Sequence, residues 1–229
     1  MINFWVRKNN TYGNIVCNFL MIFFCFQILG HDRPIIIFLN GVSSAGKSSL
    51  AKNLQDLFKE PFLHLGIDTF GAMLPERFQG VGAYASLGWE FKSSADSAER
   101  PVIEIVTGCI GKKLLAGMQH SVGALANAGN NLIIDEVLLK QEDLESYRRI
   151  LQGFRVYFIG VTAPLEIIEE REKLRGDRCL GLARGMYDIV HVNKIYDLVV
   201  DTSMYSPFDN ACRIKQFIQD NELPTSFWR

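Results

Sequence analysis

The sequence predicts an α/β fold, in which a five-stranded parallel sheet carries helices on both faces. Two observations predict it. Short, continuous apolar runs alternate along the chain with longer segments whose apolar residues recur at helical spacing. A glycine-rich segment and two aspartates directly follow three of the apolar runs. Alternating strands and helices form a parallel sheet with right-handed crossovers. Ligands bind at the carboxyl ends of such strands, which accounts for the glycine-rich segment and the aspartates at those ends.

The predicted strands are short and apolar, as strands buried on both faces must be. In chain order they cover residues 35–39, 62–67, 132–134, 156–161 and 198–200.

The predicted helices carry one apolar stripe each. In the first, Leu50, Leu54, Leu57 and Phe58 fall on one helical face. A long helix is predicted to begin near Pro101, because proline is tolerated at the first helical position and Val102, Ile105, Val106, Cys109 and Ile110 repeat at helical spacing. Further helices are predicted over residues 141–151, 164–173 and 207–219, and residues 70–100 are predicted to be irregular.

The strongest motif is a phosphate-binding loop between the first strand and the first helix. The sequence GVSSAGKS matches G-x-x-x-x-G-K-[ST]. Its glycines let successive backbone N–H groups point at phosphate oxygens, and the following helix adds its positive N-terminal end. The alternative is a glycine turn before an ordinary helix. The predicted nucleotide contacts are Gly41, Val42, Ser43, Ser44, Ala45, Gly46, Lys47, Ser48 and Ser49.

Asp135 ends the third predicted strand and suggests a Mg²⁺ site. An acid there is expected to hold Mg²⁺ through water, while the Ser48 hydroxyl ligates the ion directly. The alternative is an aspartate that caps the turn after the strand. Glu136 has no assigned role.

Three arginines, Arg171, Arg175 and Arg178, lie at spacings of four and three residues. Clustered guanidinium groups suit transferring phosphates, and Gly176 suits a movable segment, so a lid is predicted around residues 171–180. Arg175 and Arg178 join Lys47 among the predicted catalytic residues, and Arg171 is a predicted nucleotide contact. The alternative is a solvated helix whose arginines pair with the adjacent glutamates Glu169, Glu170 and Glu172.

Asp68 directly follows the second predicted strand, so its side chain is expected at the same sheet edge as the phosphate loop. A carboxylate there can accept a proton from an acceptor hydroxyl or align its oxygen. The alternative is a helix cap. Nearby aromatic residues are expected to wall an apolar acceptor pocket; they are Phe70, Phe78, Tyr84, Trp89 and Phe91.

The sequence NKIYD at 193–197 is close to the N-K-x-D guanine signature, but its Asp197 comes one residue too late. This likeness is interpreted as coincidence.

Five sequence blocks resemble the chloramphenicol phosphotransferase family. They are IIIFLNGVSSAGKSSLAKNLQ, FLHLGIDTF, NLIIDEVLL, GVTAPLEIIEEREKLRGDRCLGLA and VHVNKIYDLVVDTS, and together they span roughly residues 34 to 205. The combination of N-G-x-S-S-A-G-K-S, G-[IV]-D and R-x-x-x-R-G-D-R is much more specific than the phosphate loop alone. Residues 1–33 have no counterpart in the family, and residues 70–100 match poorly.

The resemblance implies a three-layer P-loop NTPase fold of the adenylate kinase type, a kinase that uses ATP and Mg²⁺, and a carboxylate base at Asp68. It implies transfer of the γ-phosphoryl group to a hydroxyl of a small molecule, as in chloramphenicol 3-O-phosphotransferase, an antibiotic-resistance activity. A nucleotide-dependent switch, a membrane-tethered binding module and another small-metabolite kinase remain alternatives.

The domain organisation follows from composition. Residues 34–229 are predicted to form the kinase domain and residues 1–33 a hydrophobic extension. Within the extension, 15–29 is apolar and follows Arg7 and Lys8; it is interpreted as a misassigned start, a membrane anchor or an export signal. The net charge of −1 argues against a nucleic-acid partner, and the need for ATP favours the cytoplasm.

Overall fold

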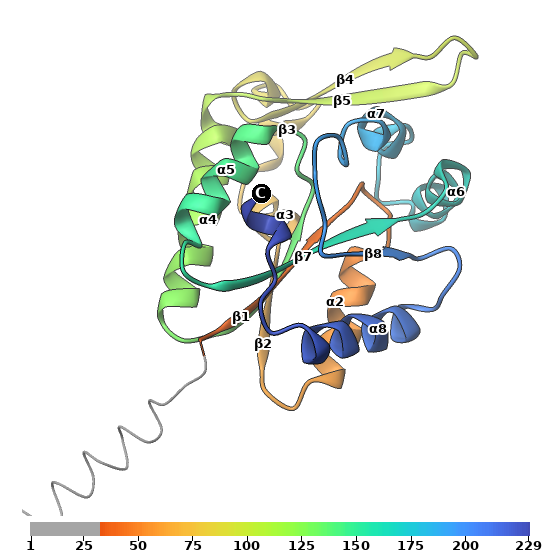
Figure 1. Ribbon diagram of the computed structural model, residues 1–229. Coiled ribbons are helices and arrows are strands. Elements are labelled where there is room, and N and C mark those ends of the chain that lie inside the picture. The colour runs from red at the N-terminus through yellow and green to blue at the C-terminus, as the bar shows by residue number, and fades with distance from the viewer. Residues whose placement is uncertain (1–32) are drawn as a thin grey trace, which may run out of the picture. The chain divides into compact units, whose positions relative to one another are not determined.

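The computed structural model describes residues 33–229 and is built around a five-stranded sheet with strand order β2-β6-β1-β7-β8 (Figure 1). All four pairings in this sheet are parallel, which confirms the predicted fold class. Each predicted strand is present. The bounds are Ile35–Asn40 for β1, Phe62–Gly66 for β2, Asn131–Glu136 for β6, Arg155–Thr162 for β7 and Leu198–Asp201 for β8.

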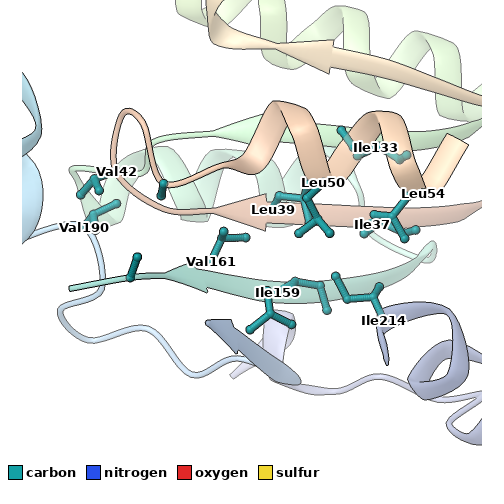
Figure 2. Close-up of a cluster of buried hydrophobic side chains, with 14 of the residues drawn as sticks. Ile37, Leu39, Val42, Leu50, Leu54, Ile133, Ile159, Val161, Val190 and Ile214 are labelled. Atoms are coloured by element: carbon teal, nitrogen blue, oxygen red, sulfur yellow. The ribbon is translucent and has the colours of Figure 1, made fainter. Parts of the chain in front are cut away.

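Helices cover both faces of this sheet because its strands are apolar on both sides. In β1, Ile37 and Leu39 point to one face, where they pack with Leu50 and Leu54 of α2 and with Ile214 of α8 (Figure 2). The helices are α2 Lys47–Leu57, α3 Ile67–Gly71, α4 Cys109–Asn127, α5 Gln141–Ile150, α6 Leu165–Arg175, α7 Leu182–Tyr187 and α8 Pro207–Asp220.

The opposite face buries a second cluster, which contains Phe38 of β1 together with Val122 of α4 and Tyr147 of α5. The C-terminal turn Ser226–Trp228 adds Phe227 to this cluster. The alternation of Ile37 and Phe38 between the faces is the two-residue period of a strand. Because each face has its own core, the register of β1 is fixed.

A smaller sheet with strand order β3-β4-β5 corrects two predictions for residues 70–110. Its strands are β3 Gln79–Gly80, β4 Trp89–Ala95 and β5 Pro101–Thr107, with short 3-10 turns at Glu76–Phe78 and Ala85–Leu87. The region predicted to be irregular therefore holds two of these strands. The prediction of a helix from Pro101 is wrong, because β5 pairs antiparallel with β4 and α4 begins only at Cys109.

The physical reason is that the spacing of Val102, Ile105 and Val106 fits a helix, whereas the composition fits a strand. Four of the seven residues from Pro101 to Thr107 are valine or isoleucine, and β-branched side chains favour strands. Pro101 sits at the first strand position, where proline is tolerated.

Residues Pro34–Arg229 form one compact unit. The expectations for residues 1–33, including the apolar run at 15–29, lie outside the described residues apart from Arg33. Across residues 33–229, none of the helices combines the length and the apolar character needed to cross a membrane.

Candidate active site

The glycine-rich loop joins β1 to α2 at the carboxyl edge of the sheet. Gly46 adopts φ +93° and directly precedes the first turn of α2, a left-handed conformation that favours glycine. The loop thus reverses the chain direction after β1, so that the N-terminus of α2 lies at the carboxyl edge of the sheet. This is the arrangement that the motif predicts for a phosphate site.

Lys47 is buried against the loop, with only 7% of its surface exposed. Its Nζ atom donates hydrogen bonds to the carbonyl oxygens of Gly41 at 3.0 Å and Val42 at 2.9 Å. It also lies 3.6 Å from Oδ1 of Asp135. The ammonium group is therefore held at the floor of the loop, with its charge partly balanced by the aspartate.

Ser48 and Asp135 form the predicted oxygen pair beside the loop. The Ser48 hydroxyl donates to Oδ2 of Asp135 at 2.6 Å. Burial acts to raise the pKa of Asp135, but the Lys47 ammonium, the His64 ring and the Ser48 hydroxyl outweigh it and hold the pKa below its ordinary value. Asp135 is therefore ionised at neutral pH. Its contacts are with functional groups of the site, which disfavours the simple capping alternative.

Three buried polar atoms lack a hydrogen-bond partner within residues 33–229. They are Oγ of Ser44, in the loop itself, Nε of Arg178, and Nε2 of His64, which lies 3.6 Å from Oδ2 of Asp135. Buried polar groups are almost always paired in folded proteins. A phosphate group in the loop would supply an acceptor for the Ser44 hydroxyl.

The three arginines line one cavity, although they do not share a helical face. Arg171 lies in α6 and donates to Oγ1 of Thr202 at 2.8 Å and to its carbonyl oxygen at 2.7 Å. The Thr202 hydroxyl in turn donates to the carbonyl of Ala45 at 2.9 Å, which ties α6 to the phosphate loop. Helix α6 ends at Arg175, so Arg178 lies in the following segment.

The other two arginines pair with aspartates. Arg175 contacts Asp177 at 3.1 Å and remains 41% exposed. Arg178 donates to the carboxylate of Asp68. Neither uses the neighbouring glutamates, so the pairing expected of a solvated helix is not what these side chains adopt. The pKa of Arg178 is raised, because the hydrogen bond and charge of Asp68 outweigh the effect of burial.

Asp68 lies in the first turn of α3, and Ile67 separates it from the end of β2. The N-cap of α3 is Gly66, and the helix has no side-chain cap hydrogen bond, so the capping alternative finds no support. The Asp68 side chain is 59% exposed and faces the cavity that the phosphate loop also lines. The structure thus brings Asp68, Arg178 and the loop to one edge of the sheet.

A cavity of about 1000 Å³ connects these groups to an apolar wall. Several elements outside the parallel sheet supply the wall: Trp89 and Phe91 from β4, Ile105 from β5, Leu115 from α4, and Leu182 and Met186 from α7. Of the five aromatic residues expected there, Trp89 and Phe91 line the cavity. The expectation is wrong for Phe70, which packs against the second core cluster, and for Phe78 and Tyr84, whose rings stack 5.5 Å apart outside the cavity.

Thr202 and Glu136 are among the polar cavity residues to which the sequence assigned no role. Thr202 bridges Arg171 and the loop, and nothing in the sequence around it signals this role. Glu136 lines the cavity, while its oxygens accept hydrogen bonds from the Tyr147 hydroxyl and the Val137 N–H, both at 2.9 Å. Burial raises the pKa of Glu136 to about 7. The sequence signal for Glu136 was its position next to Asp135 at the end of a strand.

Asp197, from the guanine-like sequence, lies in a structural position. Its carboxylate accepts the N–H of Phe158 at 2.8 Å and that of Ser226 at 3.0 Å. These bonds hold the C-terminal turn against β7, which supports the interpretation of that likeness as coincidence.

Comparison with solved structures shows that this fold is similar to that of known kinases. The adenosine phosphosulfate (APS) kinase CysC of Mycobacterium tuberculosis, solved with AMPPNP and APS, superposes with a TM-score of 0.56 at 17% identity and covers 82% of this chain and 99% of its own. A sugar kinase from Janibacter sp. HTCC2649 gives a TM-score of 0.56 at 18% identity, covering 82% and 95%. At these identities the likeness establishes the fold alone.

Sequence comparison reaches further than the fold. Two Mycobacterium tuberculosis proteins, from strains H37Rv and CDC 1551, bear the name "Putative O-phosphotransferase" and are 31% identical to this chain over 194 residues, which is 85% of this chain and 86% of each relative. The profile of the chloramphenicol phosphotransferase-like proteins matches residues 34–219. The predictions of the family, of the P-loop kinase fold and of an enzyme of the phosphotransferase class are thereby confirmed. The chain belongs to the chloramphenicol phosphotransferase-like family.

Proposed function

We propose that this protein transfers the γ-phosphoryl group of ATP to a hydroxyl group on a small molecule with an apolar body. One observation carries the proposal: a single cavity joins the phosphate-binding loop, the carboxylate of Asp68 and a wall of aromatic and aliphatic side chains. A nucleotide and an apolar alcohol can therefore occupy it together. Such proximity is the main contribution that a protein makes to phosphoryl transfer.

The loop end of the cavity suits the nucleotide. Lys47, the N-terminus of α2 and the unpaired Ser44 hydroxyl place positive charge and donors where phosphates would lie. Arg171 is held beside the loop because it donates to Thr202, whose hydroxyl donates to the Ala45 carbonyl of the loop. Because ATP is the donor, we place the reaction in the cytoplasm.

The oxygen pair of Ser48 and Asp135 fits Mg²⁺, a hard cation that prefers oxygen ligands and keeps several of its waters. The Ser48 hydroxyl would ligate the ion, and the ionised Asp135 would hold one of its waters. When bound, Mg²⁺ supplies charge neutralisation at the phosphates.

The opposite end suits the acceptor. Its apolar wall would hold the body of the molecule, while Asp68 accepts a hydrogen bond from the reacting hydroxyl and takes its proton. Arg178, which contacts Asp68, would stabilise charge on the transferring group, assisted by Arg175.

The test is incubation of the protein with ATP, Mg²⁺ and a panel of alcohols, followed by mass spectrometry for a gain of one phosphate. The panel includes chloramphenicol, other aromatic alcohols and polar sugars of similar size. We expect products from apolar or aromatic alcohols and little from the sugars. A panel in which only sugars react would contradict the assignment of the apolar wall to the acceptor.

A further inference from the structure

The segment predicted as a lid contains a buried acid that the proposed reaction does not use. Glu172 lies in the last turn of α6 with 1% of its surface exposed. Its two carboxylate oxygens accept hydrogen bonds from the backbone N–H groups of Gly181 and Ala183, both at 2.8 Å. Both side-chain oxygens are thus engaged by backbone donors. Glu172 therefore closes the segment 176–180 by fastening its far end to α6.

The residues that Glu172 holds belong to the start of α7, and α7 is attached to the β4–β5 hairpin. The Ile103 N–H of β5 donates to the Gly181 carbonyl at 2.9 Å. Gly185 lies so close to β5 that a Cβ atom there would be 2.0 Å from the Ile103 oxygen. Figure 1 shows α7 lying beneath β5 and beside α6.

A second set of contacts, made by Arg184, also joins α6, α7 and the hairpin. Arg184 of α7 donates to Oδ2 of Asp96, at the turn of the hairpin, at 3.2 Å. The same guanidinium group pairs with Glu169 of α6. Helix α7 is thus tied to α6 on one side and to the hairpin on the other.

These connections join the two ends of the cavity. The segment that Glu172 closes carries Arg178, while the hairpin and α7 carry the acceptor wall, including Phe91, Ile105 and Met186. A displacement of Arg178 toward a phosphate would therefore be transmitted through Gly181 to β5. A segment that moved independently of the hairpin would not need this buried carboxylate.

We propose that Glu172 is a positioning residue that makes α6, α7 and the β4–β5 hairpin move as one clamp, so that nucleotide binding at the lid arginines sets the position of the acceptor wall. The inference rests on the proposed function in one respect, that these arginines contact the nucleotide. Because coupling between two binding sites is reciprocal, an acceptor would in turn strengthen nucleotide binding.

The mechanical connection is tested without nucleotide, by residue-resolved amide hydrogen exchange on the wild type and on Glu172→Gln. Glutamine can accept only one of the two N–H groups and turns an NH₂ group toward the other. We expect exchange at Gly181, Ala183 and Ile103 to become about tenfold faster or more. The matched control is Glu170→Gln, an exposed position on the same helix. Faster exchange at Gly181 and Ala183 with Ile103 unchanged would overturn the clamp.

A second variant acts from the other side and leaves Glu172 intact. In Gly185→Ala the added Cβ must part α7 from β5, so Ile103 exchanges faster even if Glu172→Gln does not fold. The control is Gly117→Ala in α4, where a Cβ meets no atom within 4 Å. Unchanged exchange at Ile103 in Gly185→Ala would contradict the proposed attachment of α7 to the hairpin.

The coupling is tested by adding the non-hydrolysable analogue AMPPNP with Mg²⁺. In the wild type, exchange should slow both in the phosphate loop and at Ile103; in Gly185→Ala it should slow in the loop alone. Slowing confined to the loop of the wild type would overturn the clamp and leave nucleotide binding intact. No slowing at either place would count against nucleotide binding itself, and the clamp would fall with it.

Discussion

The parallel sheet and the β4–β5 hairpin meet at one cavity, yet they are built differently. Strands β1 and β6 are covered on both faces, and Ile37, Phe38, Ile133 and Ile134 are fully buried. The hairpin strand β4 is half-buried at its start and exposed over Lys92–Ala95. The groups that we assign to the nucleotide sit at the ends of the first set of strands, and much of the acceptor wall sits on the second.

The difference indicates which positions of this protein tolerate substitution. A substitution in β1 or β6 disturbs close-packed cores on two faces, which costs about 2–5 kcal/mol for a large-to-small change. A substitution at a half-buried hairpin position changes the cavity wall with less effect on folding. In the proposed function, the phosphate-binding groups therefore lie on the more buried element and much of the acceptor wall on the more exposed one.

The largest expected effect follows from Asp68→Asn, at the sheet edge. Asparagine cannot accept the proton, so turnover should fall by about 10²–10⁴-fold. The free energy of unfolding should change by only about 0–1 kcal/mol, because the Asp68–Arg178 pair is largely exposed on the Asp68 side. Turnover and urea unfolding measured on the same preparations check this. Asp56→Asn, an exposed position on α2, is the control. Unchanged turnover in Asp68→Asn would show that another group orients the acceptor.

Loss of Arg178 should be the next largest effect. Arg178→Ala should lower turnover by about 10²-fold, as removal of one donor to transition-state charge does. Arg178→Lys should not fully restore turnover, since lysine lacks the planar fork of donors. Arg175→Ala should have a smaller effect, because Arg175 is more exposed and pairs with Asp177. Equal turnover in Arg178→Ala and the wild type would return this segment to a structural role.

The hairpin should behave in the opposite way. Phe91→Ala removes part of the acceptor wall, so KM for the acceptor should rise by about tenfold, or ~1.4 kcal/mol, while KM for ATP stays nearly constant. Tyr84→Ala is the matched control, because its ring stacks on Phe78 outside the cavity. Steady-state kinetics with an alcohol from the panel measures both constants. A rise in KM for ATP alone would contradict the assignment of the acceptor wall to the hairpin.

The last prediction concerns stability near Glu136, and it leaves the division between sheet and hairpin untouched. Its folded pKa of about 7 lies above the ordinary value of 4.5, so the folded state binds more protons between these values. Its contribution to stability is present below pH 4.5 and is lost as the pH rises through 7. Glutamine stays neutral, can accept the Val137 N–H and can donate to the Tyr147 hydroxyl. Glu136→Gln should therefore be more stable than the wild type at pH 8 by about 1–3 kcal/mol, and nearly equal to it at pH 4.5.

Urea unfolding at the two pH values measures this difference. A Glu136→Gln variant that is less stable than the wild type at pH 8 would show that the ionised carboxylate is favoured where it lies.

The same two regions differ in how far the sequence predicts them. The strands of the parallel sheet are continuous apolar runs, and the glycine loop has a fixed spacing, so both follow from local patterns. Strand β5 does not, because the spacing of Val102, Ile105 and Val106 fits a helix as well as a strand. Pairing with β4 decides between them, and that pairing joins residues 6 to 18 positions apart, which the spacing of apolar residues within β5 does not report.

The candidate site divides in the same way. Lys47, Ser48 and Asp135 follow from the motif and the strand end, and the structure places them in contact. The contact of Asp68 with Arg178 joins residues 110 positions apart, and Thr202 reaches the loop from 157 positions away. Which aromatic rings face the cavity depends on the path of residues 70–100, which sequence periodicity leaves undefined.

The central claim is that the γ-phosphoryl group moves from ATP to an alcohol, and the destination of a label tests it most directly. With ATP carrying ¹⁸O in the γ-phosphoryl group, Mg²⁺ and the alcohol panel, we expect the label in a phosphate ester of an alcohol. Lys47→Ala should lose that ester, because Lys47 is the cation at the floor of the phosphate loop. Label found only in inorganic phosphate, whatever the alcohol, would contradict the claim and indicate a nucleotide-hydrolysing switch.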